Sequence, residues 1–272
     1  MFLRKPTIII IFLLLLFVSI GTSAYSQQKI NDFYLSNLKG DGTQDWEVKG
    51  KTATIRDNYV DINDMEASYY TKEDTILITS DEATLNKESM DVFLENNVHI
   101  ENEEGATLET DSLRWQRDQN LIETEDRIIA MRDAMEIESV GLSADTELKT
   151  ADFKKDVKVT LPDKERKDVT TAVCSGPLEI EYTKGKAVFN QDVVVTNPQG
   201  KLYSDKATLF FDTKSKEIVK IISEGNVKIV QGSNVTFSQK ATYLSKEQKI
   251  LLEGRPRVVY YPGSGEDLNL FK

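Results

Sequence analysis

The sequence predicts an all-β protein of repeated antiparallel strands, and three observations support this prediction. One pattern recurs at residues 97–115, 192–209 and 226–243: apolar residues after Asn or Asp, a turn, a Ser/Thr step that Asp follows in the first two copies, and an alternating strand. Val193 and Val227 hold equivalent positions 34 residues apart, and such a fixed period indicates stacked supersecondary units. Apolar residues recur at i and i+2 rather than at i, i+3 and i+4, which is typical of strands.

The N-terminal residues 1–26 predict an export signal or a membrane anchor. The basic pair Arg4-Lys5 precedes an apolar run over residues 8–20, and residues 24–26 offer a small-x-small cleavage site. The run is shorter than the roughly 20 residues that span a membrane, although counting from 6 to 24 lengthens it to 19. A cleaved signal peptide and a retained hydrophobic helix therefore both stay open. Either would take the chain out of the cytoplasm, and an exported chain without a disulfide suggests a bacterial periplasm.

The elements that follow are expected to be strands joined by short polar turns. Residues 27–45 are polar and are expected to be extended. Strand-like alternation begins near Trp46, and residues 64–70 and 75–81 continue it. The first strands near Trp46 and the last one, residues 257–261, are the expected sheet edges, which could pair with other chains.

A charged stretch at residues 161–168 is the best candidate for a linker. It predicts two β domains, at 30–165 and 171–262, followed by a flexible tail at 263–272. In the Ser143-Ala144-Asp145 copy, the apolar positions slip by one residue, which predicts a bulge or a frayed edge there.

The composition excludes several kinds of site. A net charge of −11 argues against nucleic-acid binding, which needs a basic surface. One cysteine and one histidine exclude an intrachain disulfide and a Cys/His zinc site. Cys174 is expected to be a small buried residue on a strand. His99 is expected to lie on the strand face opposite Val98 and Ile100, in contact with solvent.

The sequence predicts no enzyme and no cofactor or metal. Asp111 and Asp205 recur at the same position of the repeat, which suits a turn cap better than acid–base catalysis. A β-helix lyase or esterase would need clustered carboxylates, a Ser-His pair or a metal. A structural or adhesive exported repeat protein without a ligand is the main alternative. A continuous apolar interior groove would distinguish a lipid carrier from it.

Short motifs of the chain resemble two related families. The first set is ATL at 83–85, VFLENNV at 92–98, GATLETD at 105–111, GLSAD at 141–145 and DVKV at 156–159. Through it, residues 30–165 resemble the LptC family, a periplasmic component of lipopolysaccharide export anchored in the inner membrane. The second set is CSGPLEIEY at 174–182, AVF at 187–189, GKLYSD at 200–205 and EGNV at 224–227. Through it, residues 171–262 resemble the LptA/OstA bridge domain.

The resemblance implies a twisted, open β-jellyroll whose apolar inner faces form a groove. In the family, this groove carries the acyl chains of lipid A from an inner-membrane ABC transporter toward the outer membrane. It also implies lipopolysaccharide, the transporter complex and other jellyroll bridge proteins as partners.

Alternation and resemblance together predict which residues line the groove. They are the apolar residues expected to point inward: Phe93, Val98, Ile100, Leu113, Trp115, Phe189, Val193, Val195, Leu209, Phe211, Val227, Ile229 and Tyr243.

Overall fold

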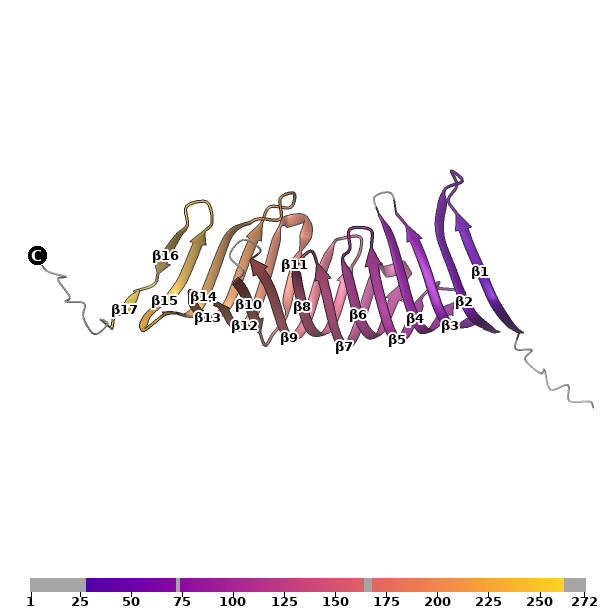
Figure 1. The fold of residues 1–272 in the computed structure, drawn as a ribbon, viewed down its shortest axis with the longest axis horizontal. Helices are drawn as coiled ribbons and strands as arrows, with labels where there is room; N and C mark the ends of the chain where they lie inside the picture. Colours follow the sequence, from indigo (N-terminus) through magenta and orange to yellow (C-terminus); the bar gives the residue numbers. More distant parts are fainter. Residues whose placement is uncertain (1–27, 72–73, 164–167, 262–272) are drawn as a thin grey trace, which may run out of the picture.

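The computed structural model describes residues 28–71, 74–163 and 168–261, which form one antiparallel sheet of 17 strands. The expected signal or anchor at 1–26 and the expected tail at 263–272 lie outside these residues. Figure 1 shows the strands side by side along one axis, with the N-terminal strands at one end and the C-terminal strands at the other. The prediction of an all-β fold is confirmed.

The chain runs as a meander in which most strands pair with the next; β10 and β11 both pair with β9 and β12, and β16 and β17 both pair with β15. The first nine strands are β1 (Gln28–Leu38), β2 (Gln44–Arg56), β3 (Tyr59–Tyr70), β4 (Thr75–Asn86), β5 (Val92–Asn102), β6 (Thr107–Gln116), β7 (Leu121–Arg132), β8 (Met135–Asp145) and β9 (Thr150–Asp163). The others are β10 (Asp168–Cys174), β11 (Leu178–Glu181), β12 (Lys186–Asn197), β13 (Gly200–Phe211), β14 (Ile218–Gln231), β15 (Asn234–Leu244), β16 (Lys249–Glu253) and β17 (Arg257–Val259). Two short 3₁₀ helices, η1 (Arg117–Gln119) and η2 (Tyr182–Lys184), lie in turns.

Most of the long strands bend in the middle, and the sheet folds over along the line of these bends. Register shifts recur there, for example between Glu95 and Val98 on β5 and between Glu224 and Val227 on β14. Asn97 and Asn226 have positive φ at these points, a conformation that Asn tolerates better than most residues. Bulges of this kind bend a strand and increase its twist. Each bent strand therefore contributes one half to each of two facing layers.

We call these two layers arm A and arm B. Arm A holds the strand halves that end at the turns after β2, β4, β6 and β8, and arm B holds those that end at the turns after β1, β3, β5 and β7. β10 and β11 continue this division, because both pair with β9, one with each half of it. Pro177 lies in the gap between them, where its missing N–H removes a ladder hydrogen bond.

The Ser/Thr step of the repeat lies at the bend, and on some strands its hydroxyl caps the bend. Ser80 and Ser139 are buried there, and each hydroxyl donates to a backbone oxygen two residues later, at 2.9 Å for Ser80 and 3.2 Å for Ser139. On β13 and β15, the hydroxyls of Ser204 and Ser238 are buried without a hydrogen-bond partner among the described residues. On the outer side of the bend, Asn226 donates to the carboxylate of Asp205 at 2.9 Å. Asp205 therefore caps a bend, as expected from its position in the repeat.

The predicted bulge at Ser143-Ala144-Asp145 was wrong. These residues pair in regular register with β9, and the register shift of β8 lies between Glu138 and Val140. The bend hydroxyl of this strand is Ser139, four residues before the Ser-Asp step expected from the sequence. Leu142 and Ala144 lie three and five residues after Ser139 and pack inward, as Leu113 and Trp115 do after Thr110.

The interior contains two clusters of buried residues that share a neighbour. The N-terminal core is formed by Phe33, Ala53, Ile62, Met65, Ala83, Leu94, Val98 and Leu113. The central core is formed by Ile128, Ile137, Leu142, Phe153, Val157, Val159, Ala172, Cys174, Leu178, Ala187, Phe189, Val193 and Ala207. Leu108 packs against both. The central core crosses the expected boundary at 161–168, where β9 and β10 form a hairpin of the same sheet.

The sheet begins earlier than expected. Residues 28–38 form β1, which pairs with β2 over nearly its whole length. The strand near Trp46, β2, is therefore paired with a strand along each of its edges, and β1 is the N-terminal edge strand of the sheet. Tyr34, Leu35 and Leu38 are exposed on this edge strand.

Candidate functional site

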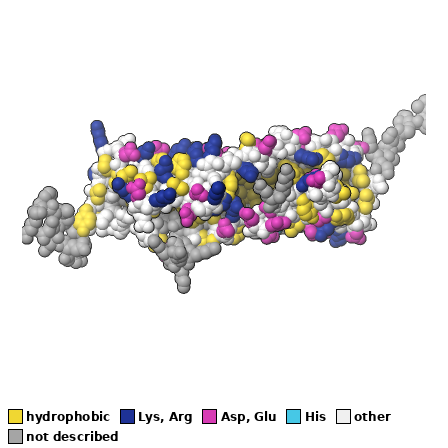
Figure 2. Space-filling view, turned by 90° about the horizontal axis from the view of Figure 1, so that it is seen from above, with side chains coloured by type: hydrophobic (Ala, Val, Ile, Leu, Met, Phe, Trp, Pro, Cys, Tyr) yellow, Lys and Arg dark blue, Asp and Glu magenta, His cyan; other side chains and the backbone are white. Residues whose placement is uncertain are grey.

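An apolar cavity of about 160 Å³ lies between the two arms, over β2 to β7. Its apolar lining from arm A is Ile62, Ala83, Leu85, Met90, Val92, Leu94, Leu113, Trp115 and Ile122. Its apolar lining from arm B is Trp46, Val48, Met65, Ala67, Tyr69, Ile78 and Ile100. Figure 2 shows hydrophobic side chains in a hollow between flanking charged ones. An apolar cavity of this order of size can take up apolar ligands.

Aromatic side chains meet across the cavity. The rings of Tyr69 on arm B and Trp115 on arm A lie 6.0 Å apart in an edge-to-face arrangement. Their strands, β3 and β6, are not neighbours in the sheet, so this contact joins the arms rather than adjacent strands. Trp46 lies beside Tyr69 on the neighbouring strand. Each of the three rings is near a strand end, where the arms open.

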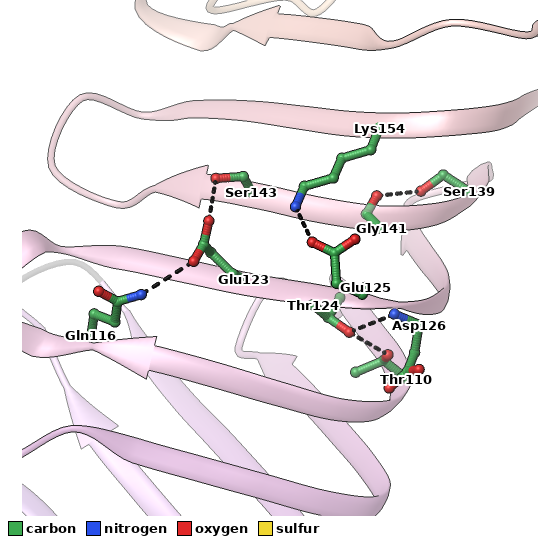
Figure 3. Close-up of polar contacts among 10 residues, drawn as sticks. All are labelled: Thr110, Gln116, Glu123, Thr124, Glu125, Asp126, Ser139, Gly141, Ser143 and Lys154. Atoms are coloured by element: carbon green, nitrogen blue, oxygen red, sulfur yellow. Dashed lines mark hydrogen bonds and ion pairs between the residues drawn. The ribbon is translucent and has the colours of Figure 1, made fainter.

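Polar groups on the outer faces of the strands are paired with one another. On β6 to β9, Gln116 and Ser143 both donate to Glu123, and Lys154 pairs with Glu125 at 2.6 Å (Figure 3). His99 lies on the outer face, as expected, with its ring nitrogens 3.5 Å from Glu109 and 3.7 Å from Glu101. These contacts support the sheet and leave the interior to apolar side chains.

Cys174 is buried in the central core, as expected. Its thiol donates to the carbonyl oxygen of Gly176 at 3.3 Å, and burial raises its pKa to about 11. A thiol in this state is protonated and a poor nucleophile. Within residues 28–71, 74–163 and 168–261, no group of three or more His, Cys, Asp or Glu side chains is placed to hold a metal ion. In the same ranges, no helix is long and apolar enough to cross a membrane.

Two family models match the chain. One, described as lipopolysaccharide-assembly, LptC-related, covers residues 66–162, and the other, described as LptA/(LptD N-terminal domain) LPS transport protein, covers residues 172–267. Residues 66–162 are LptC-related, and residues 172–267 are LptA-like. This confirms the resemblance inferred from the sequence motifs, and it supports a role in lipopolysaccharide transport. A search of curated proteins gives no match.

The cavity lies mostly within the LptC-related part, and the structure brings some of the predicted groove residues to it. Ile100, Leu113 and Trp115 line the cavity. Val98 is buried next to it, at the bend of β5.

The predicted residues of the LptA-like part share the interior face but lie in packed surroundings. Phe189 and Val193 belong to the central core, and Val195, Leu209 and Phe211 pack against it. Val227 is buried at the bend of β14, and Ile229 and Tyr243 lie opposite the inward positions Leu202 and Ile221.

Phe93 is the exception, because it lies on the outer face of arm A. Its neighbours Val92 and Leu94 line the cavity, and successive residues of a strand point to opposite faces. The ring of Phe93 is covered instead by the guanidinium of Arg114, 5.8 Å from its centre, on the adjacent strand. Phe93 is therefore not part of the interior set that the sequence predicted.

Several cavity residues were missed from the sequence. Trp46, Val48, Tyr69 and Ile78 lie on β2 to β4, before the first clear copy of the repeat at residues 97–115. The signal that could have found them is the same i, i+2 alternation, which is present in Trp46-Glu47-Val48 and in Ala67-Ser68-Tyr69.

Proposed function

We propose that this protein is a periplasmic lipid carrier of lipopolysaccharide export. In this proposal, the acyl chains of lipid A lie between the two arms while the sugars stay in water. The lipid passes from an inner-membrane ABC transporter toward the outer membrane. The observation that carries the proposal is the apolar cavity between the arms, within a chain related to LptC and LptA.

The energetics of acyl chains explain why such an interior would be needed. Each methylene that leaves water gains about 0.8 kcal/mol, so a lipid with several acyl chains cannot cross an aqueous gap unaided at a useful rate. An apolar path between the arms lowers that barrier at each step. The path needs no catalytic group, so the proposal involves no enzyme activity.

Direction must come from outside the carrier. A ligand that binds equally well along a track does not shift any equilibrium along it. The proposal therefore requires the ABC transporter as the source of free energy. It also requires neighbouring jellyroll proteins that extend the path through sheet edges.

The interior where the LptC-related part meets the LptA-like part is filled by packed side chains in this structure. Ile128, Val157 and Leu178 are almost completely buried between the arms in the central core. Acyl chains that move from the LptC-related part toward Phe189 and Phe211 would have to replace some of these side-chain contacts. The proposal therefore includes a separation of the arms during passage.

The two tryptophans of the chain, Trp46 and Trp115, provide the test, because both line the cavity. Titration of the full-length protein in detergent with lipopolysaccharide should shift tryptophan emission to shorter wavelength, as acyl chains replace water around the indoles. The polysaccharide released from the same lipid, without acyl chains, should leave the spectrum unchanged. An unchanged spectrum at saturating lipopolysaccharide would contradict the proposal. Trp46→Phe and Trp115→Phe would show which indole reports the binding.

A further inference from the structure

Arg117 is the basic residue that lines the apolar cavity. It follows Leu113 and Trp115 at the same two-residue spacing, just past the end of β6, and it is exposed. Its backbone N–H donates to the carboxylate of Asp91 at 3.1 Å, which fixes the start of η1 against the neighbouring turn. The residue is thus held where the apolar interior ends and solvent begins.

The side chain of Arg117 differs from those of four other arginines of the LptC-related end of the protein. Arg56, Arg127 and Arg132 each form an ion pair with a carboxylate, and Arg114 covers Phe93. In the part of the chain that the structure describes, the guanidinium of Arg117 has no hydrogen bond and no ion pair. A guanidinium offers five donors in a fixed fork, which matches phosphate and carboxylate oxygens.

The aromatic rings of the cavity indicate where the polar head of a bound lipid would lie relative to Arg117. Trp46, Tyr69 and Trp115 line the cavity near the strand ends. Tyr and Trp favour positions where one end of the ring is apolar and the other meets water. An amphiphile whose chains fill the cavity would therefore have its polar head at the level of Arg117. The protein as a whole carries a net charge of −11, so an anionic head needs a local cation to be accepted.

We infer that Arg117 binds a phosphate group on the sugar head of the lipid whose acyl chains occupy the cavity. This inference rests on the proposed function, since it places the head of the same lipid. The ligand class is an acylated, phosphorylated glycolipid, and the recognised chemistry is guanidinium to phosphate. Arg117 would thereby set both the orientation of the lipid and a preference for phosphorylated over neutral forms.

The test compares lipid A with its fully dephosphorylated form, using the full-length protein in detergent and tryptophan emission as the readout. Wild type should bind the phosphorylated lipid about tenfold more tightly, the order expected for one charge-assisted contact. Arg117→Gln should bring the two affinities together while leaving that for the dephosphorylated lipid unchanged. Arg117→Lys should restore part of the preference.

Arg114→Gln is the matched control, because Arg114 lies three residues away on the outer face, and it should keep the full preference. Thermal melting of each variant checks that the fold is retained, and Arg117 is exposed enough for its replacement to be tolerated. A phosphate preference that survives in Arg117→Gln would overturn the inference.

Failure of this inference can be told apart from failure of the proposed function. If neither form of the lipid changes the emission, then the acyl chains do not enter the cavity and both are wrong. If both forms bind with equal affinity to wild type, the carrier proposal stands and the role of Arg117 is wrong.

Discussion

The pKa of the single cysteine depends on how tightly its thiol is packed at the centre of the molecule. Cys174 is 4% exposed and belongs to the central core, and its thiol is hydrogen-bonded to Gly176. Burial disfavours the thiolate and raises the pKa of Cys174 to about 11. In the unfolded chain, the ordinary pKa of the thiol is 9.0. The unfolded state therefore loses this proton first as the pH rises.

This difference predicts a loss of stability between pH 9 and 11. Below pH 9 both states keep the proton, so the contribution is fully present. Above it, the free energy of unfolding should fall by up to about 2–3 kcal/mol as the pH approaches 11. Urea unfolding of wild type and Cys174→Ala at pH 8 and 10.5 measures it, since groups common to both cancel. The same pH dependence in both proteins would show that the thiol is not buried as described.

The inward or outward direction of a side chain was predicted correctly for Leu113 and Trp115 and wrongly for Phe93. Alternation correctly predicted that Leu113 and Trp115 point inward, because the Ser/Thr step fixes their parity. Phe93 lies before the bend of β5, where no such step fixes the parity. Its hydrophobicity favoured the interior, but the cation of Arg114 covers its ring outside. A contact between adjacent strands of this kind is not visible until the register is known.

At the scale of the strand, the bends depend on residues that tolerate positive φ and on side chains that cap them. Gly225 has φ +76°, and a Cβ there would lie 2.3 Å from an oxygen of Asp205. That same carboxylate accepts a hydrogen bond from Asn226. The glycine thus leaves room for the cap of its own bend.

Gly225→Ala should therefore destabilise the protein more than Gly232→Ala. Gly232 also has positive φ, +57°, but a Cβ there meets nothing within 4 Å. The control should cost about 1–2 kcal/mol for the backbone conformation alone. Gly225→Ala should cost about 1–3 kcal/mol more, because the carboxylate has to move. Chemical denaturation measures both, and equal losses would contradict the assigned role of the Asp205 cap.

The strands themselves were largely predictable, whereas their ends and bends were less so. The period of two residues identified the strands from Trp46 onward, but the apolar residues of β1 do not alternate with polar ones, so this segment was expected only to be extended. The bend of β8 was predicted four residues too late. Ser143-Ala144-Asp145 matches the repeat motif, but the hydroxyl at the bend belongs to Ser139. A short motif can occur twice in one strand, and only the pairing with β9 decides between the copies.

At the scale of the whole molecule, the sheet and its central core run through the expected boundary between two domains. The charged stretch at 161–168 was expected to be a linker. The strands on its two sides are paired, because β9 pairs with both β10 and β11. The LptC-related match ends at residue 162, and the LptA-like match begins at residue 172. The LptC-related and LptA-like parts thus share one continuous sheet.

The two ends of this sheet are open edges. β17 pairs with β15 through only three residues, and Val258 and Tyr261 at this end are exposed. Exposed edges can add a strand from a neighbouring chain. Deletion of residues 257–272 should therefore weaken binding to other jellyroll bridge proteins while lowering the melting temperature only slightly. Unchanged binding of these partners would exclude this edge as a docking surface.

The central claim, that lipid acyl chains travel between the arms, predicts alternation along single strands. Photoreactive residues placed in cells at Trp115 and Phe211, which face the interior, test it against Arg114 and Phe210, which precede them on the outer face. The account predicts ATP-dependent adducts with lipopolysaccharide at the two inward positions and none at the outward ones. Adducts without alternation, or none in a folded and exported protein, would contradict it.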